Sequence, residues 1–102
     1  MPKGIDKIDW DAVHALACDV ANAAVADDDV LLASKNAALL DLLFKLKEKY
    51  GDHPAILATI ADYLDDPDDR RALYTKALSI ARNQGDQFEI DEIEESLRSI
   101  EE

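Results

Sequence analysis

Three side chains near the N-terminus have the donor types and the spacing of a metal site. Asp11, His14 and Cys18 follow a three-then-four spacing, so a helix through them would carry a carboxylate, an imidazole and a thiol on one face. Zinc held in this way needs a fourth ligand, and the other histidine, His53, stands before a proline in a predicted turn. A surface His14 beside a partly buried Cys18 explains the pattern without a metal. The sequence therefore predicts no metal ligands and no cofactor.

The sequence lacks the signatures of catalysis. It contains no HExxH, CxxC or GxSxG pattern, and its three glycines are too few for most phosphate-binding loops. We therefore expect a protein without enzymatic activity.

Clusters of acids are the most frequent feature of the chain, and in principle they could bind a divalent cation or act as acid and base. The clusters are Asp27 to Asp29, Asp65 with Asp66, and Asp68 with Asp69. Each cluster lies at a predicted helix start, where carboxylates accept hydrogen bonds from free N–H groups and suit the positive end of the helix dipole. Helix capping is therefore the simpler explanation of each cluster.

Capping does not explain the total charge of −12. Residues 52–102 contain 14 acids and five bases, a balance of −9, whereas residues 1–51 contain nine acids and six bases, a balance of −3. The excess is strongest near the C-terminus, where Arg98 alone opposes Asp86, Glu89, Asp91, Glu92, Glu94, Glu95, Glu101 and Glu102. Such a charge repels phosphate backbones and anionic lipids, so we expect a basic protein partner and no direct binding of nucleic acid or membrane.

We expect this partner to bind the acidic C-terminal half. Several of its acids surround one predicted turn next to Tyr63, whose amphipathic ring suits an interface. Trp10 is a second amphipathic ring of this kind, and for both rings core packing is the more common role. The residues predicted to contact the partner are Asp62, Tyr63, Asp65, Asp66, Asp68, Asp69, Glu89, Glu92 and Glu95.

The elements that position these residues are predicted to be helices. The chain is 48% hydrophobic, with only three glycines and three prolines, which is typical of an all-α fold. Its single cysteine excludes an internal disulfide, and no apolar run is long enough to span a bilayer. Residues 1–6 lack the basic-then-apolar order of a secretory signal. We therefore expect a cytoplasmic protein.

Apolar periodicity and helix-ending residues predict a single all-α domain over residues 1–102. Its five antiparallel helices are expected over about 10–26, 29–50, 54–64, 67–83 and 86–100. Gly51 and Gly85 are expected to end the second and fourth helices in the left-handed conformation, and Pro54 and Pro67 to open the third and fourth. The apolar run from Leu39 to Leu46 covers most of a helix circumference, so the second helix is expected at the centre of the core.

An internal repeat connects these helices. Gly51-Asp52 and Gly85-Asp86 are 34 residues apart, and the preceding helices align at the same offset, which is the tetratricopeptide period. We therefore expect helical hairpins stacked as a degenerate tetratricopeptide-like fold, with the fifth helix as its cap. An unrelated five-helix bundle with a coincidental spacing is the alternative.

The last helix carries one narrow apolar stripe of Ile90, Ile93, Leu97 and Ile100. This stripe can either close the core or pair with a second copy of the chain. A monomer is the expected state.

Two stretches together resemble a known family. They are Lys47-Glu48-Lys49-Tyr50-Gly51-Asp52-His53-Pro54, which leads into Ile56-Leu57-Ala58-Thr59, and Arg71-Ala72-Leu73-Tyr74-Thr75-Lys76-Ala77-Leu78, which leads to Ala81-Arg82-Asn83-Gln84-Gly85-Asp86. Over residues 39 to 90 the chain resembles small helical bacterial immunity proteins of contact-dependent growth inhibition and polymorphic-toxin systems.

The resemblance implies an antitoxin that binds one toxin domain tightly in the cytoplasm and blocks it stoichiometrically. Such toxins are often nucleases, including tRNases, with basic clefts that a negative helical surface would complement. The alternative is a small tetratricopeptide-like adaptor that binds a peptide or protein in the groove between its hairpins.

Overall fold

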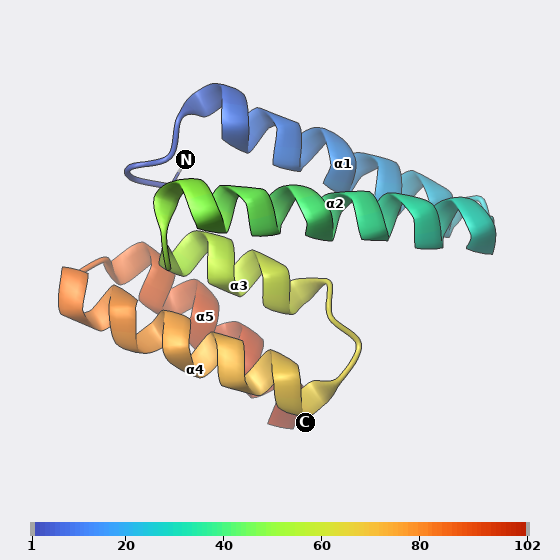
Figure 1. The fold of residues 1–102 in the computed structure, drawn as a ribbon. Helices are drawn as coiled ribbons and strands as arrows, with labels where there is room; N and C mark the ends of the chain where they lie inside the picture. Colours follow the sequence, from blue (N-terminus) through green and yellow to red (C-terminus); the bar gives the residue numbers. More distant parts are fainter. Residues whose placement is uncertain (1, 102) are drawn as a thin grey trace. The chain divides into compact units, whose positions relative to one another are not determined.

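The computed structural model describes residues 2–101, which form five α-helices and no strand. The helices are α1 (Lys7–Val25), α2 (Asp29–Tyr50), α3 (Pro54–Asp62), α4 (Pro67–Gln84) and α5 (Gln87–Glu101) (Figure 1). The predicted all-helical class is therefore confirmed. Within the described residues, no helix combines the length and the apolar character needed to cross a membrane.

The chain divides into two compact units, and the boundary between them in the sequence lies between Tyr50 and Gly51. Unit 1 contains α1 and α2, and unit 2 contains α3, α4 and α5. The expectation of a single domain stays a prediction.

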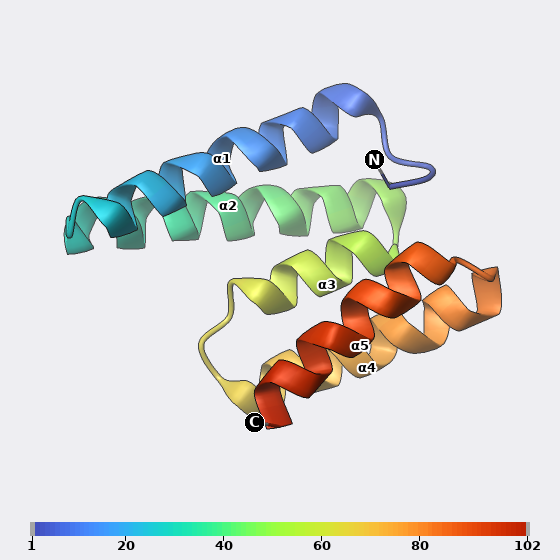
Figure 2. The same ribbon diagram turned by 180° about the vertical axis from the view of Figure 1, so that it is seen from behind.

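Unit 1 is a hairpin of two long antiparallel helices, which run side by side in Figure 1 and Figure 2. Buried residues recur along both helices at helical spacing. They are Val13 and Ala23 on α1, and Leu39, Leu43 and Leu46 on α2. Phe44 is 50% exposed, so the apolar surface that covers most of the circumference of α2 is not buried at this residue.

The turn between α1 and α2 is a Schellman motif with an aspartate at its left-handed position. The Asp27 N–H donates to the Ala24 carbonyl at 3.2 Å, and the Asp28 N–H donates to the Ala23 carbonyl at 3.1 Å. Asp27 has φ of +55°. The Asp28 carboxylate then accepts a hydrogen bond from the Leu31 N–H at 3.0 Å, so the predicted capping of α2 by this acid cluster is confirmed.

The expected and observed helix bounds differ most at two helix ends. The first helix begins at Lys7 rather than near residue 10, because a first turn needs no buried face and periodicity detects only the buried face. The third helix ends at Asp62 rather than at residue 64. Tyr63 leaves helical geometry there, and Pro67 holds the residue before it in an extended conformation.

Side chains before two prolines cap the helices of unit 2. His53 accepts a hydrogen bond at Nδ1 from the Ala55 N–H at 3.1 Å, one residue beyond Pro54. Asp66 accepts hydrogen bonds from the N–H groups of Asp68 and Asp69 at 2.8 and 3.4 Å. The predicted roles of Asp66 and Pro67 are confirmed.

The two glycines that align in the repeat both have left-handed backbones. Gly51 has φ of +78° and Gly85 has φ of +68°, a region in which a Cβ is strained. Both predicted helix stops are confirmed.

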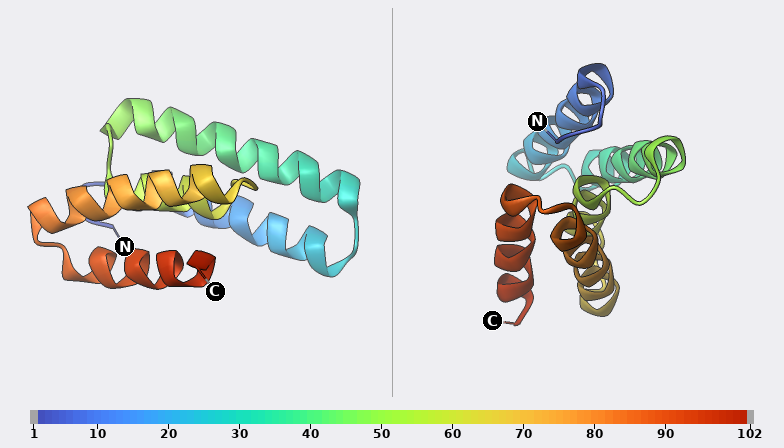
Figure 3. Two further views of the ribbon diagram at one scale, coloured as in Figure 1. Left: turned by 90° about the horizontal axis from the view of Figure 1, so that it is seen from below. Right: turned by 90° about the vertical axis from the view of Figure 1, so that its left-hand side faces the viewer.

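The core of unit 2 lies among its three helices. In Figure 3, α4 and α5 run side by side in opposite directions, and α3 packs on α4 and also touches α5. The fully buried cluster consists of Leu57, Ala61, Tyr74, Ala77, Leu78, Ala81 and Ile93. Ile90, Leu97 and Ile100 pack against it, so the apolar stripe of α5 closes the core of its own unit.

Candidate functional site: the acidic surface of unit 2

The predicted contact residues lie on three elements of unit 2. Asp62 ends α3 and Tyr63 is its half-buried C-cap. Asp65, Asp66, Asp68 and Asp69 are exposed in the turn and at the start of α4, and Glu92 and Glu95 are exposed on α5. Glu89 is only 8% exposed, so we leave it out of the contact surface.

Asp62 belongs to a polar cluster between α3 and α4. The buried Tyr74 hydroxyl donates a hydrogen bond to its carboxylate. The Arg70 Nε donates to the Ala61 carbonyl at 3.1 Å, and the guanidinium lies 6.0 Å from the centre of the Tyr74 ring. Arg70 thereby donates a hydrogen bond to a backbone carbonyl in the last turn of α3.

Two acids from different helices repel each other on this surface. Although Asp62 is exposed as a residue, desolvation of its carboxyl group raises its pKa. The hydrogen bond from Tyr74 and the charge of Arg70 lower the same pKa, and the charge of Glu92 on α5 raises it. The structure therefore brings Asp62 and Glu92 within electrostatic range.

Glu89 lies in the first turn of α5. The Asp86 carboxylate accepts a hydrogen bond from the Glu89 N–H at 3.3 Å. Burial raises the pKa of the Glu89 carboxyl, the charge of Asp86 raises it further, and that of His53 opposes them. The turn from residue 63 to residue 66 is at the other end of unit 2, near the end of α5 (Figures 1 and 2). The exposed predicted residues thus form an acidic band along unit 2 and not one compact patch. The band consists of Asp62, Asp65, Asp66, Asp68, Asp69, Glu92 and Glu95.

The five basic side chains of unit 2 do not neutralise this band. Each has one acid of the unit beside it: Arg70 is near Asp62, and ion pairs join Arg71 to Asp68, Lys76 to Asp52, Arg82 to Glu94 and Arg98 to Glu95. Among the described residues, no lysine or arginine lies within ion-pairing distance of Asp65, Asp69, Asp91 or Glu92. These carboxylates face solvent, so the negative charge is available to a partner.

Known proteins contribute nothing to the interpretation of this surface. No family model, curated protein or solved structure matches the chain.

Sequence reasoning missed Phe88, which lies on the same acidic band. Its side chain is 70% exposed in the first turn of α5. The signal was available, because Phe88 falls outside the apolar stripe that begins at Ile90. Helical spacing alone would have placed Phe88 on the polar face of the last helix, opposite the apolar stripe.

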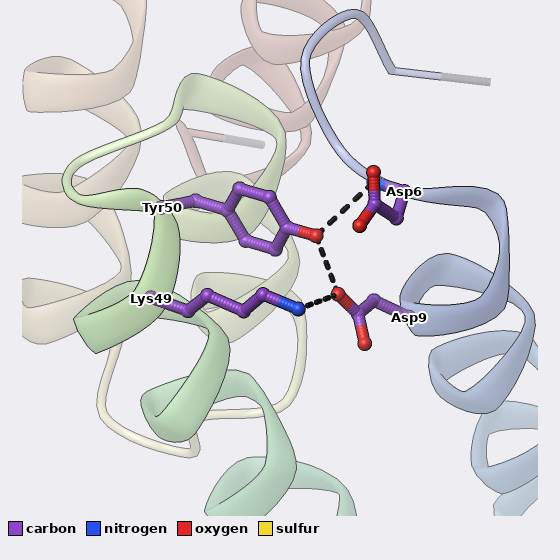
Figure 4. A network of polar contacts seen from close by, with 4 residues as sticks. All are labelled: Asp6, Asp9, Lys49 and Tyr50. Carbon is purple, nitrogen blue, oxygen red and sulfur yellow. Dashed lines mark hydrogen bonds and ion pairs between the residues drawn. The ribbon is translucent and has the colours of Figure 1, made fainter.

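A second polar network joins the start of α1 to the end of α2 in unit 1 (Figure 4). Asp9 accepts hydrogen bonds from the Tyr50 hydroxyl and, at 2.8 Å, from the Lys49 Nζ. The same Tyr50 oxygen accepts a hydrogen bond from the Asp6 N–H at 3.2 Å. All three contacts connect residues at least 40 positions apart in sequence, so the network fastens the open end of the hairpin.

The pKa shifts of this network indicate a structural role. The hydrogen bond from Lys49 lowers the pKa of Asp9, and Tyr50 lowers it further. The hydrogen bonds to Asp9 raise the pKa of both Lys49 and Tyr50. Each group is thereby held in its ordinary protonation state at neutral pH, whereas a general acid or base needs a pKa near the working pH.

The candidate metal ligands of α1 are all exposed. Asp11 forms an ion pair with Lys7 at 2.6 Å, and the His14 ring meets the edge of Trp10 with 6.1 Å between ring centres. Cys18 is exposed, so the expectation that it is partly buried was wrong. No group of three potential ligands in the described residues has the geometry of a metal site.

Proposed function

We propose that this chain is an immunity protein that binds a basic nuclease toxin domain, such as a tRNase, and blocks it by stoichiometric occlusion. The observation that carries the proposal is the exposed acidic band of unit 2. Each basic side chain of the unit has one acid beside it, and among the described residues Asp65, Asp69, Asp91 and Glu92 have no lysine or arginine partner.

Folding does not account for this excess. Asp66 caps α4, and Asp68 and Asp69 suit its N-terminal dipole. Asp91 and Glu92 are exposed beyond the start of α5, and neither side chain has a basic partner among the described residues. Like charges on one surface destabilise a fold through repulsion, and they accelerate encounter with a partner of opposite charge.

The proposal includes a degenerate tetratricopeptide-like architecture. Two hairpins, α1–α2 and α3–α4, each end at a left-handed glycine, and these glycines are 34 residues apart. In this arrangement α5 is the cap, with an apolar side on the core and a charged side in solvent.

The test uses the purified chain and the toxin domain encoded by the neighbouring gene. The proposal predicts a 1:1 complex in size-exclusion chromatography with light scattering. It also predicts loss of nuclease activity at equimolar ratio and an association rate that falls as salt increases. A neighbouring toxin domain that stays fully active with excess chain would refute it.

A matched pair of variants locates the contact. Replacing both Asp91 and Glu92 by lysine, which reverses their charges, should lower the association rate at low salt by about tenfold. Reversing Asp41 and Glu48 on α2 changes the net charge equally and should have a much smaller effect. Equal losses in both variants would mean that total charge, and not this surface, governs binding. A short basic peptide that binds as tightly as the folded toxin domain would favour an adaptor instead.

A further inference from the structure

We infer that Phe88 is the anchor by which the acidic face of α5 engages its partner, inserting into an apolar pocket bordered by lysine or arginine. The inference rests on the proposed function, and it specifies the part of the contact that determines how long the complex lasts.

Phe88 lies in the first turn of α5, at the N-terminal end of its solvent face. At 3.6 residues per turn, Asp91, Glu92 and Glu95 lie on the same side of the helix as Phe88, and all four residues are exposed. The stripe that includes the buried Ile93 lies on the opposite side. The result is one exposed aromatic ring with three carboxylates following it along the same helix face.

Packing inside the protein does not explain this ring. Phe88 is 70% exposed, and it is absent from the apolar cluster that the other large apolar residues of α5 join. Phenylalanine is also a weaker helix former than the neighbouring glutamates. Its replacement should therefore leave the fold intact.

The surroundings of the ring specify the chemistry of the partner. Aromatic side chains that become fully desolvated at the centre of an interface contribute most of the binding energy, while surrounding charges contribute mainly to the encounter rate. Three carboxylates next to one ring, two of them without a basic partner among the described residues, fit a basic surface with an apolar recess. They disfavour a second copy of this chain, which would bring like charges together, and an anionic membrane.

The experiment compares Phe88→Ala with Phe44→Ala. Phe44 provides the matched control because it is also an exposed helical phenylalanine, at 50%, with Lys45 beside it in sequence. Binding of each chain to the neighbouring toxin domain is measured by surface plasmon resonance, and folding by urea denaturation. Phe88→Ala should raise the dissociation rate about 30-fold with little change in the association rate. Phe44→Ala should match the unmodified chain, and Phe88→Trp should retain tight binding.

The outcomes separate the anchor from the function. If the unmodified chain binds and Phe88→Ala dissociates at the same rate, the anchor is refuted and the proposed function stands. A loss as large in Phe44→Ala, or a Phe88→Ala variant that is unfolded, also overturns the anchor. If the unmodified chain does not bind the toxin domain, both proposals fail.

Discussion

The Tyr74 hydroxyl donates a hydrogen bond to the carboxylate of Asp62, twelve residues earlier in the chain. The ring of Tyr74 is fully buried among the apolar residues of unit 2, whereas Asp62 ends α3 at the surface. This bond connects the buried core directly to the acidic band, and it holds one of the predicted contact residues in place.

Removing that hydrogen bond should destabilise unit 2 measurably. Tyr74→Phe keeps the buried ring and deletes the hydroxyl, so we expect a loss of about 1 kcal/mol in the free energy of unfolding, as for a typical intramolecular hydrogen bond. Urea denaturation followed by circular dichroism measures this loss. In an Asp62→Asn background the same substitution should cost less. An equal cost in both backgrounds would show that the hydroxyl acts without Asp62.

A glycine at position 27 should stabilise the hairpin of unit 1. Asp27 has φ of +55°, where glycine avoids a strain of roughly 1 kcal/mol. We expect Asp27→Gly to raise the free energy of unfolding by about 0.5 to 1 kcal/mol. Gly85→Ala should do the reverse by a similar amount, because φ there is +68° and no atom crowds the added methyl group. Thermal unfolding of both variants checks the signs.

The pH dependence of stability should include a contribution from Glu89. Burial raises its pKa above the ordinary value of 4.5. A carboxyl with a raised pKa stabilises the folded state below its ordinary pKa, and this contribution disappears as the pH rises through the folded-state pKa. Glu89→Gln should therefore raise the melting temperature at pH 7 more than at pH 4.5. An equal rise at both pH values would contradict the assignment.

The network at Asp9 should have the opposite pH dependence. Lys49 and then Tyr50 lower the pKa of Asp9 from its ordinary value of 3.8, so its contribution is present above that pH and is lost as the pH falls through the lowered pKa. Tyr50→Phe should lower the melting temperature at pH 7. Trp10, the only tryptophan of the chain, adjoins Asp9 and reports the change by fluorescence. Removing the exposed ion pair of Lys45 with Asp41 should have little effect.

The sequence predicted helix ends well because local chemistry determines them. Gly85 needs only its own left-handed backbone, and Asp66 needs only the N–H groups two and three residues later. The start of α1 at Lys7 was missed because no buried residue marks that first turn.

Contacts between helices could not be predicted in this way. Nothing in the spacing indicates that Tyr74 bonds to Asp62, or that Arg70 reaches the Ala61 carbonyl. The burial of Glu89 and the exposure of Phe44 likewise depend on how the helices pack. The net charge could be calculated from the sequence. Which acids form ion pairs, and that Asp91 and Glu92 have no basic partner among the described residues, could be seen only in the structure.

The exposed apolar side chains make the behaviour of the molecule in concentrated solution depend on its charge. Val25, Val30 and Phe88 are each at least 70% exposed, and at neutral pH the net charge of −12 keeps neighbouring molecules apart. Near the isoelectric point of about 4.3 that repulsion vanishes, while these side chains stay exposed to solvent. The osmotic second virial coefficient should therefore change from positive to negative as the pH is lowered toward this value, so the protein loses colloidal stability in the acid range where protonation of Glu89 favours its fold.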